Sequence, residues 1–455
     1  MTDFKLPPRG GKVFFAGLGG IGMSALAQFF RSLGFAVAGS DRDISSPSQA
    51  DLFAKLAKQG INHYVQDGSG VKEFQPDLIV YSSALEEDNP DFIAAGDTSR
   101  LHRSAAMAAA VKLSGLKAIA IAGSCGKTSV TAWIAATLRA MGKAPVMING
   151  GYSPDLESDS HPGNFGDGSE FVIFEADESD GSLVNFDPEV SILLNMGDDH
   201  HSQDKLEKMF ATFLSNGQKQ VVKKELDYLL PENAQSLSIL DEGADFLNSE
   251  IYHNDSGVCF TLNNQAEVQT SQWGEHSADN ALAVIAALRS CEFSLEEILP
   301  ALKAFCGVRR RFEFKGRVGQ AALYDDYAHN PQKIAACIRA AKDIFGTSVH
   351  CLFQPHGYGP LGFMRDALKR ELKGVLNNED KFTLLPVFYA GGTSSFKPSS
   401  QEVAQDYQES GLPATALEKR DEIDLSDNKY GTILVLGARD PSLPAWSASL
   451  CGENL

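Results

Sequence analysis

The sequence predicts an α/β protein of three domains, each built around a largely parallel sheet. Three observations lead to this prediction. The chain has 455 residues, enough for three domains of roughly 150 residues each. In residues 12–27 and again in residues 118–140, an apolar strand pattern runs into a glycine-rich turn and then into helical spacing of apolar residues. Beyond residue 320, strand and helix patterns alternate once more.

Composition limits the classes of partner. The net charge of -19 argues against a nucleic-acid or membrane-surface binder, although a local loop can still concentrate positive charge around an anion. The seven cysteines are scattered without a Cys-x-x-Cys pair, which indicates reduced thiols. The N-terminal residues do not resemble a signal peptide, and no apolar run reaches membrane-spanning length. We therefore expect a cytoplasmic protein with no nucleic-acid and no membrane partner.

The first domain opens with a strand at residues 12–16 and a glycine-rich turn, and a second strand ends at Asp41. In such a turn the backbone can approach a pyrophosphate, and the acid after the second strand lies near a ribose. The ligand predicted by this pattern is NAD or the pyrophosphate of a UDP-sugar; a tight turn without a ligand is the alternative. The turn residues concerned are Gly17, Gly19, Gly20, Ile21 and Gly22.

A further strand at residues 77–81 ends in Ser82 and Ser83. Ligands of open α/β sheets sit at the carboxyl ends of strands, so these serines are predicted ligand neighbours, or else helix caps. A helical pattern covers residues 105–113. We place the domains at residues 1–115, 116–314 and 315–455.

The second domain is organised around a phosphate-binding loop. Its strand, residues 118–122, leads into a glycine turn and a helix. Backbone N–H groups at a helix start point at an anion, and Lys127 adds a full positive charge. The first glycine lies closer to the Gly-Lys-Thr group than in the usual motif, so a tight turn with a surface lysine is the alternative. The predicted phosphate-binding residues are Gly123, Ser124, Gly126, Lys127, Thr128 and Ser129.

Acidic and imidazole side chains follow the next two strands of this domain. One strand ends at Glu175, and the strand at residues 190–195 leads to His200. Together with the Thr128 hydroxyl they predict a Mg²⁺ site beside a nucleotide triphosphate. Solvated acidic loops are the alternative.

Two further groups complete this domain. His276 and Asn280 share one face of a helix that begins near residue 274, where they can bind a nucleobase or cap the helix. The three arginines at 309–311 are either solvated charge or neutralise a phosphate.

The third domain repeats the βαβ alternation. A strand ending at Asp325 and Asp326 precedes His329, and the strand at residues 348–353 precedes His356. Two more strands are predicted at residues 382–388 and 431–436.

Taken together, and in this order, these motifs resemble the Mur ligases, the ATP-dependent amide-forming enzymes of bacterial cell-wall synthesis. The resemblance covers essentially the whole chain. It implies a Rossmann-like UDP-binding domain, a central ATPase domain of the phosphate-loop type, and a C-terminal Rossmann-like domain. Its marks are Gly17 to Ala27, Gly39 to Asp41, Gly123 to Thr128, Glu175 to Asp180, Asp199-His200, Arg310 to Phe312, Asp325 to His329 and Gln354 to His356.

The resemblance also implies roles for residues. Lys127 would contact the ATP phosphates, Thr128 and Glu175 would hold the Mg²⁺ at those phosphates, and His200 would help to place a second Mg²⁺ near the substrate carboxylate. His276 and Asn280 would lie near the adenine. The glycine turn and Asp41 would bind the UDP part, which favours UDP over NAD, with Ser82, Ser83, His329 and His356 as further substrate contacts. The catalytic set is Lys127, Glu175, His200, Arg311 and Asp326, of which the last two would bind nucleotide from the hinge and from the third domain.

The implied reaction joins the lactyl carboxylate of UDP-N-acetylmuramate to an amino acid through an acyl phosphate, in a monomer or homodimer. L-Alanine is the default acceptor. Alanine-adding members carry arginines where this chain has Gly357 and Pro360, so another amino acid or a recycled tripeptide stays open; Arg365 or Arg439 is a possible substitute. Ser277 replaces the usual asparagine after His276. An NAD(P)-dependent oxidoreductase and a non-catalytic nucleotide-binding relative are the alternatives from other classes.

Overall fold

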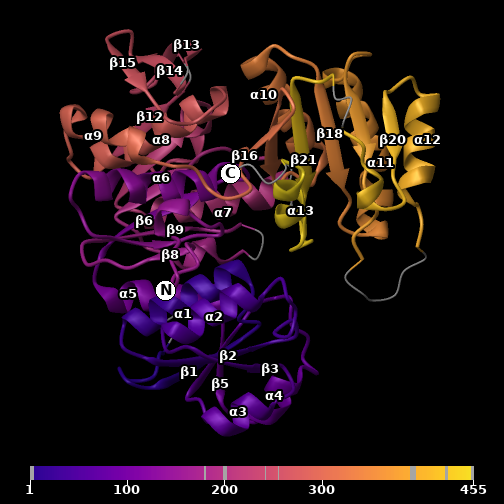
Figure 1. The fold of residues 1–455 in the computed structure, drawn as a ribbon. Coiled ribbons are helices and arrows are strands. Elements are labelled where there is room, and N and C mark those ends of the chain that lie inside the picture. Colours follow the sequence, from indigo (N-terminus) through magenta and orange to yellow (C-terminus); the bar gives the residue numbers. More distant parts are fainter. Residues whose placement is uncertain are drawn as a thin grey trace. The chain divides into compact units, whose positions relative to one another are not determined.

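The computed structural model describes residues 5–178, 181–197, 202–240, 242–254, 256–389, 396–425 and 429–451. The chain forms two compact units, residues 1–308 and 309–455 (Figure 1). Each unit contains parallel sheet flanked by helices, so the predicted α/β class is confirmed. The division at residues 115 and 314 stays a prediction.

The N-terminal sheet of the first unit has the order β3-β2-β1-β4-β5, and its pairs are parallel. Alternate residues of β1 face opposite layers. Phe15 packs with α1, α2 and their neighbours, whereas Phe14 packs with Val71 of α3 and Phe92 of α4. Helices therefore cover both faces, as expected for a doubly wound sheet. The elements are β1 (Lys12–Ala16), α1 (Ile21–Ser32), β2 (Ala36–Asp41), α2 (Ala50–Lys58), β3 (Asn62–Val65), α3 (Ser69–Phe74), β4 (Leu78–Tyr81), α4 (Pro90–Ala95), β5 (Ser99–His102) and α5 (Arg103–Ser114).

A second sheet of the same unit has the order β12-β11-β10-β6-β9-β7-β8. Its phosphate-loop strand β6 lies at the centre, between β10 and β9. Strand β8 alone pairs antiparallel among the described strands of this sheet. The elements are β6 (Lys117–Ala122), α6 (Lys127–Ala140), β7 (Pro145–Ile148), β8 (Phe165–Gly166), β9 (Phe171–Glu175), β10 (Val190–Leu193), α7 (Gln203–Asn216), β11 (Lys219–Lys223), β12 (Ser236–Ile239), α8 (Glu275–Ser290) and α9 (Leu295–Ala301).

The polar stretch of residues 152–169, which precedes β9, connects these two sheets through hydrogen bonds to α1. Asn164 donates hydrogen bonds to the Ile21 carbonyl (2.7 Å) and to the Ser24 hydroxyl (2.9 Å), both on α1. The Gln28 amide donates to Asn164 Oδ1 at 3.0 Å, and both side chains are buried. One apolar cluster runs from α1 to residues beneath the second sheet, such as Phe165. The two sheets of the first unit thus share a core.

A small antiparallel sheet packs on α8 and completes the first unit. It contains β13 (Asn248–Asn254), β14 (Gly257–Leu262) and β15 (Ala266–Gln269). Its inward residues, such as Val258 and Phe260, are fully buried in the same cluster as the apolar face of α8.

The second unit holds one sheet in the order β16-β17-β21-β18-β19-β20, parallel except for β16 (Figure 1). Helices α10, α11 and α12 pack against one face, and α13 packs against the other through Leu443. Within the described ranges, none of the helices is both long and apolar enough to span a bilayer. The elements are β16 (Glu313–Val318), β17 (Ala321–Asp326), α10 (Pro331–Phe345), β18 (Val349–Gln354), α11 (Tyr358–Val375), β19 (Lys381–Leu384), α12 (Ser400–Glu409), β20 (Ala414–Ala416), β21 (Thr432–Gly437) and α13 (Leu443–Ser449).

A buried histidine in β18 predicts how stability depends on pH. His350 is 2% exposed, and its Nε2 lies 2.9 Å from the Thr383 hydroxyl. Burial lowers its pKa to about 3. The unfolded chain, with a histidine pKa of about 6.5, takes up a proton that the folded chain refuses. The contribution of His350 to stability is therefore present above about pH 6.5 and is lost as the pH falls toward about 3.

We expect His350→Gln to flatten the decline in unfolding free energy between pH 7 and pH 5 by about 1 kcal/mol per pH unit on average, because glutamine keeps a polar contact with Thr383 but does not titrate. Urea denaturation of the wild type and the variant at several pH values measures this difference. Parallel curves for the two proteins would contradict the assignment.

Candidate active site

The phosphate loop between β6 and α6 is held in place by the end of β10. The Cys125 N–H donates to Asn195 Oδ1 (2.9 Å), and Asn195 Nδ2 donates back to the Cys125 carbonyl (3.0 Å). The Gly197 N–H donates to the Ser124 hydroxyl at 2.9 Å. Gly126, at the N-terminus of α6, has a φ of +89°, a left-handed conformation that glycine adopts at no steric cost. The loop is thus shaped before any anion binds.

Lys127 begins α6 and lies across this loop. Its ammonium donates to the Gly123 carbonyl (2.6 Å) and to Glu178 Oε2 (2.7 Å). The Glu178 side chain is 4% exposed and that of Lys127 14% exposed. The Lys127 ammonium thus lies at the helix N-terminus, where the helix dipole also favours an anion.

The predicted metal ligands Thr128 and Glu175 lie side by side. The Thr128 hydroxyl donates to Glu175 Oε2 at 2.9 Å, and the Gly150 N–H donates to Glu175 Oε1 at 2.5 Å. A carboxylate and a hydroxyl beside a phosphate loop are the hard oxygen donors that Mg²⁺ prefers. His200 lies outside the described residues. Within the described ranges, no cluster of three or more His, Cys, Asp or Glu side chains has metal-binding geometry.

The predicted adenine residues lie on α8. Asn280 borders the phosphate loop, because a Cβ added at Gly126 would lie 2.8 Å from Asn280 Oδ1. His276 is exposed one turn earlier on the helix. Ser277 is buried and donates to the Trp273 carbonyl at 2.8 Å. The Trp273 ring lies parallel to that of His253, with centroids 6.2 Å apart.

In the N-terminal sheet, Asp41 closes the glycine turn. Its Oδ2 accepts the Gly19 N–H (2.8 Å) and its Oδ1 accepts the Asp43 N–H (2.9 Å). The carboxylate that the sequence pattern assigns to a ribose thus shapes the loop itself. Ser82 and Ser83 follow β4, which pairs with β1, so they lie at the same sheet edge as the turn. The remaining predicted members of this site, Gly17, Gly20, Ile21 and Gly22, form the turn and the start of α1.

A cavity of about 250 Å³ connects this edge with the second sheet. Ile21 and Gly22 of the glycine turn line one side, and Gly150 and Glu175 line the other. The predicted sugar-nucleotide turn and the predicted metal carboxylate therefore face one space.

Polar residues without a predicted role also line the cavity. Arg103 pairs with Asp177 at 3.2 Å. Asn149 is 1% exposed, and neither atom of its side-chain amide has a hydrogen-bond partner within the described ranges. An unpartnered buried amide is costly, so we interpret Asn149 as a ligand contact. Its signal in the sequence is its position at the end of β7.

In the second unit, the Asp326 carboxylate accepts hydrogen bonds from two backbone N–H groups. Its Oδ2 accepts the Phe312 N–H (2.7 Å) and its Oδ1 accepts the Ala328 N–H (2.8 Å). The guanidinium of Arg311 lies 5.6 Å from the centre of the Tyr327 ring. Asp326 is the last residue of β17, and Arg311 lies beside Tyr327, which follows this strand. Both side chains are therefore near the carboxyl end of β17.

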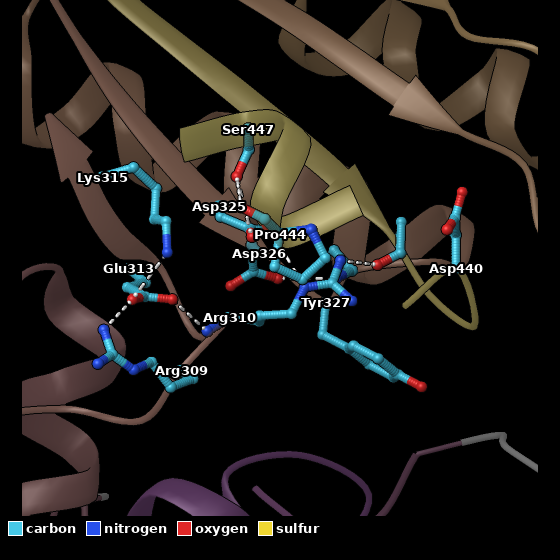
Figure 2. A network of polar contacts seen from close by, with 12 residues as sticks. Arg309, Arg310, Glu313, Lys315, Asp325, Asp326, Tyr327, Asp440, Pro444 and Ser447 are labelled. Carbon is cyan, nitrogen blue, oxygen red and sulfur yellow. Dashed lines mark hydrogen bonds and ion pairs between the residues drawn. The ribbon is translucent and has the colours of Figure 1, made fainter. Parts of the chain in front are cut away.

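Arg310 connects the loops of this edge (Figure 2). Its Nε donates to Asp325 Oδ1 at 3.2 Å, and its Nη2 donates to the Gly437 carbonyl at 2.6 Å. Ser447 of α13 donates to Asp325 Oδ2 at 3.3 Å. Asp325 is fully buried, and burial is the main cause that raises its pKa, while Arg310 opposes the rise.

His329 and His356 lie together at this edge, with ring centroids 5.3 Å apart and planes at 87°. Burial lowers the pKa of both rings, that of His356 to about 4. Nearby positive charge lowers both pKa values further, from Lys333, Arg311 and Arg439 at His329, and from His329 and Arg439 at His356. Both rings are therefore neutral near pH 7, and they suit hydrogen bonding rather than charge neutralisation.

Comparisons with known proteins cover nearly the whole chain. Residues 12–114 match the family model described as Mur ligase family, catalytic domain; residues 121–288 match the Mur ligase middle domain; residues 310–438 match the Mur ligase, glutamate ligase domain. The UDP-N-acetylmuramate–L-alanine ligase of Fusobacterium nucleatum is 31% identical, over 87% of this chain and 86% of its own length. The enzyme of that name from Myxococcus xanthus is 30% identical, over 94% and 92%.

Solved structures agree in fold. The UDP-N-acetylmuramate–alanine ligase of Thermotoga maritima superimposes with a TM-score of 0.80 at 26% identity, covering 97% of this chain and 98% of its own. A murein peptide ligase from Psychrobacter arcticus superimposes with a TM-score of 0.69 at 22% identity, covering 98% and 100%. The second likeness concerns the fold alone.

Proposed function

Because this chain belongs to the Mur ligase family, we propose that it joins the lactyl carboxylate of UDP-N-acetylmuramate to the amino group of an amino acid at the expense of ATP, with L-alanine as the default acceptor. It is thus a C–N ligase of peptidoglycan precursor synthesis. The observation that carries the proposal is the cavity shared by the glycine turn and Glu175, since a sugar nucleotide held at the turn can extend its carboxylate toward the phosphate loop. The oxidoreductase alternative is set aside, because all three matching family models describe ligases.

The residues of the first unit suit the first half of this reaction. The loop N–H groups and Lys127 would bind the ATP phosphates and stabilise the charge on the transferring phosphoryl group. Thr128 and Glu175 would hold Mg²⁺, which supplies further charge neutralisation at the phosphate oxygens, and His200 would help to place a second Mg²⁺ near the substrate carboxylate. The lactyl carboxylate attacks the γ-phosphorus, and an acyl phosphate and ADP form.

In the second half of the reaction, the acceptor amine attacks the acyl carbon, and inorganic phosphate leaves. We assign the third domain to this half and to the nucleotide contacts of Arg311 and Asp326. The neutral rings of His329 and His356 would donate or accept hydrogen bonds with a substrate. Asp41 would support the UDP contact indirectly, because it fixes Gly19. His276 and Asn280 would contact the adenine.

The proposal predicts ATP- and Mg²⁺-dependent phosphate release in the presence of UDP-N-acetylmuramate and L-alanine, with an amide product of the matching mass. Glycine, L-serine and the stem tripeptide serve as parallel acceptors. A preference for one of these would keep the ligase function and change the acceptor. Folded protein that binds ATP but turns over no acceptor would contradict the proposal and favour a non-catalytic relative.

A further inference from the structure

We propose that Arg439 binds the carboxylate of the incoming amino acid; this inference rests on the ligase function proposed above. The first unit presents two sheet edges with glycine loops, which we assigned to the sugar nucleotide and to ATP. The remaining parallel sheet lies in the second unit. Ligands of such sheets bind at the carboxyl ends of the strands, so the third reactant is expected at the loops that follow β17, β21 and β18.

Strand register brings the relevant loops together. Gln354 of β18 pairs with Gly437 of β21, and Asp326 of β17 pairs with Leu436. The loops that carry His356, Arg439 and His329 therefore start side by side. This agrees with the influence of the Arg439 charge on both histidines.

Arg439 has an unusual backbone and a free side chain. Its φ is +64°, a left-handed conformation that favours glycine and disfavours a long side chain. The residue is exposed, and its guanidinium makes no hydrogen bond or ion pair with any described residue. A strained residue that makes no contact for the fold is a reason to look for a functional one.

Three other arginines of the second unit are engaged in ion pairs. Arg365 pairs with Asp406 at 2.7 Å between α11 and α12. Arg420 pairs with Asp440, which is buried and also accepts the Ser442 N–H. Arg310 pairs with Asp325. Asp440, although next to Arg439 in the sequence, therefore has its own cation and leaves the Arg439 charge unneutralised.

The loop after β18 offers no cation of its own at this edge. Gly357 has a φ of +140°, and Pro360 lies 3.2 Å from the position that a Cβ on Gly357 would take. An arginine at position 357 would require a different backbone. Arg439 comes from the neighbouring strand and provides the planar fork of N–H donors that a carboxylate accepts in bidentate fashion.

A pair of acceptors that differ only in this carboxylate tests the inference. We expect the wild type to prefer L-alanine over L-alaninamide, which lacks the negative charge. Arg439→Gly should lower kcat/KM for L-alanine about 100-fold, through KM, and leave kcat/KM for L-alaninamide within about threefold. KM for ATP should not change. Arg439→Lys keeps the positive charge but not the planar fork of N–H donors. Its kcat/KM for L-alanine should lie between that of the wild type and that of Arg439→Gly.

Thermal unfolding provides a readout of the fold, because Arg439→Gly relieves the left-handed strain and should raise the melting temperature while acceptor binding is lost. Arg365→Ala, which removes an arginine already paired with Asp406, is the control and should keep the preference for L-alanine. An unchanged preference in Arg439→Gly would overturn the inference and leave the ligase function intact. Failure of the wild type to ligate any amino acid would overturn the proposed function, and this inference with it.

Discussion

Lys127→Ala is expected to lower kcat for ligation by about 10²–10³-fold or more, because it removes the charge that we propose faces the transferring phosphoryl group. The structure adds a second consequence. Glu178 is almost fully buried and loses its cation, which costs up to about 3–5 kcal/mol of unfolding free energy for a buried pair. Lost activity in this variant therefore has two sources, catalytic and structural.

A double variant separates them. In Lys127→Ala combined with Glu178→Gln, no buried charge is left unpaired, so stability should return to near that of the wild type while ligation stays lost. Glu178→Gln alone keeps the lysine and should retain most of the activity. Phosphate release and urea denaturation, measured on all four proteins, give the answer. Ligation near the wild-type rate in the double variant would show that the phosphate site is misplaced.

Arg310→Ala is expected to destabilise the second unit by about 3–5 kcal/mol, because it leaves the fully buried Asp325 with Ser447 as its remaining side-chain partner (Figure 2). It also removes the hydrogen bond to the Gly437 carbonyl. Without Arg310, the pKa of Asp325 rises further, since burial already raises it. A carboxyl whose folded pKa is raised stabilises the fold as the pH falls, so the loss should be smaller at pH 5 than at pH 7.

Arg309→Ala is the matched control, because Arg309 is 41% exposed and its partner Glu313, 12% exposed, keeps a second cation in Lys315. We expect it to cost no more than about 1 kcal/mol. In the Arg310→Ala background, Asp325→Asn should restore part of the stability by removing the buried charge. Equal effects of the Arg309 and Arg310 variants in urea denaturation would contradict the distinction between them.

Local patterns predicted the strands that carry the site. The strands before Gly17, Gly123 and Glu175 were predicted within one residue of their observed bounds, because periodicity and glycine placement are local properties. The stretch at 152–169 is rich in Gly, Ser, Asp and Pro, a composition that predicts a polar loop, yet it contains β8, which forms through pairing with β7. A two-residue strand leaves no periodic signal.

The side chains that hold the site loops in place could not be predicted from local sequence patterns. The partners of the phosphate loop, Asn195 and Glu178, come from other strands, and their roles follow from sheet order. Asp41 was assigned to a ribose, whereas its contact with the Gly19 N–H requires knowing how the turn folds back on β2. Arg310, one of three adjacent arginines, is distinguished from its neighbours by the buried Asp325. The roles of the site residues themselves remain predictions.

The buried hydrogen bonds between Asn164 and helix α1 have a consequence for the choice of donor. They set the span between the glycine turn and Glu175, because α1 begins at the turn and Asn164 belongs to the sheet that carries Glu175. Because this distance is fixed, it selects sugar nucleotides by their length. A sugar nucleotide one group too short would bind at the turn and leave its carboxylate out of reach of the phosphate loop.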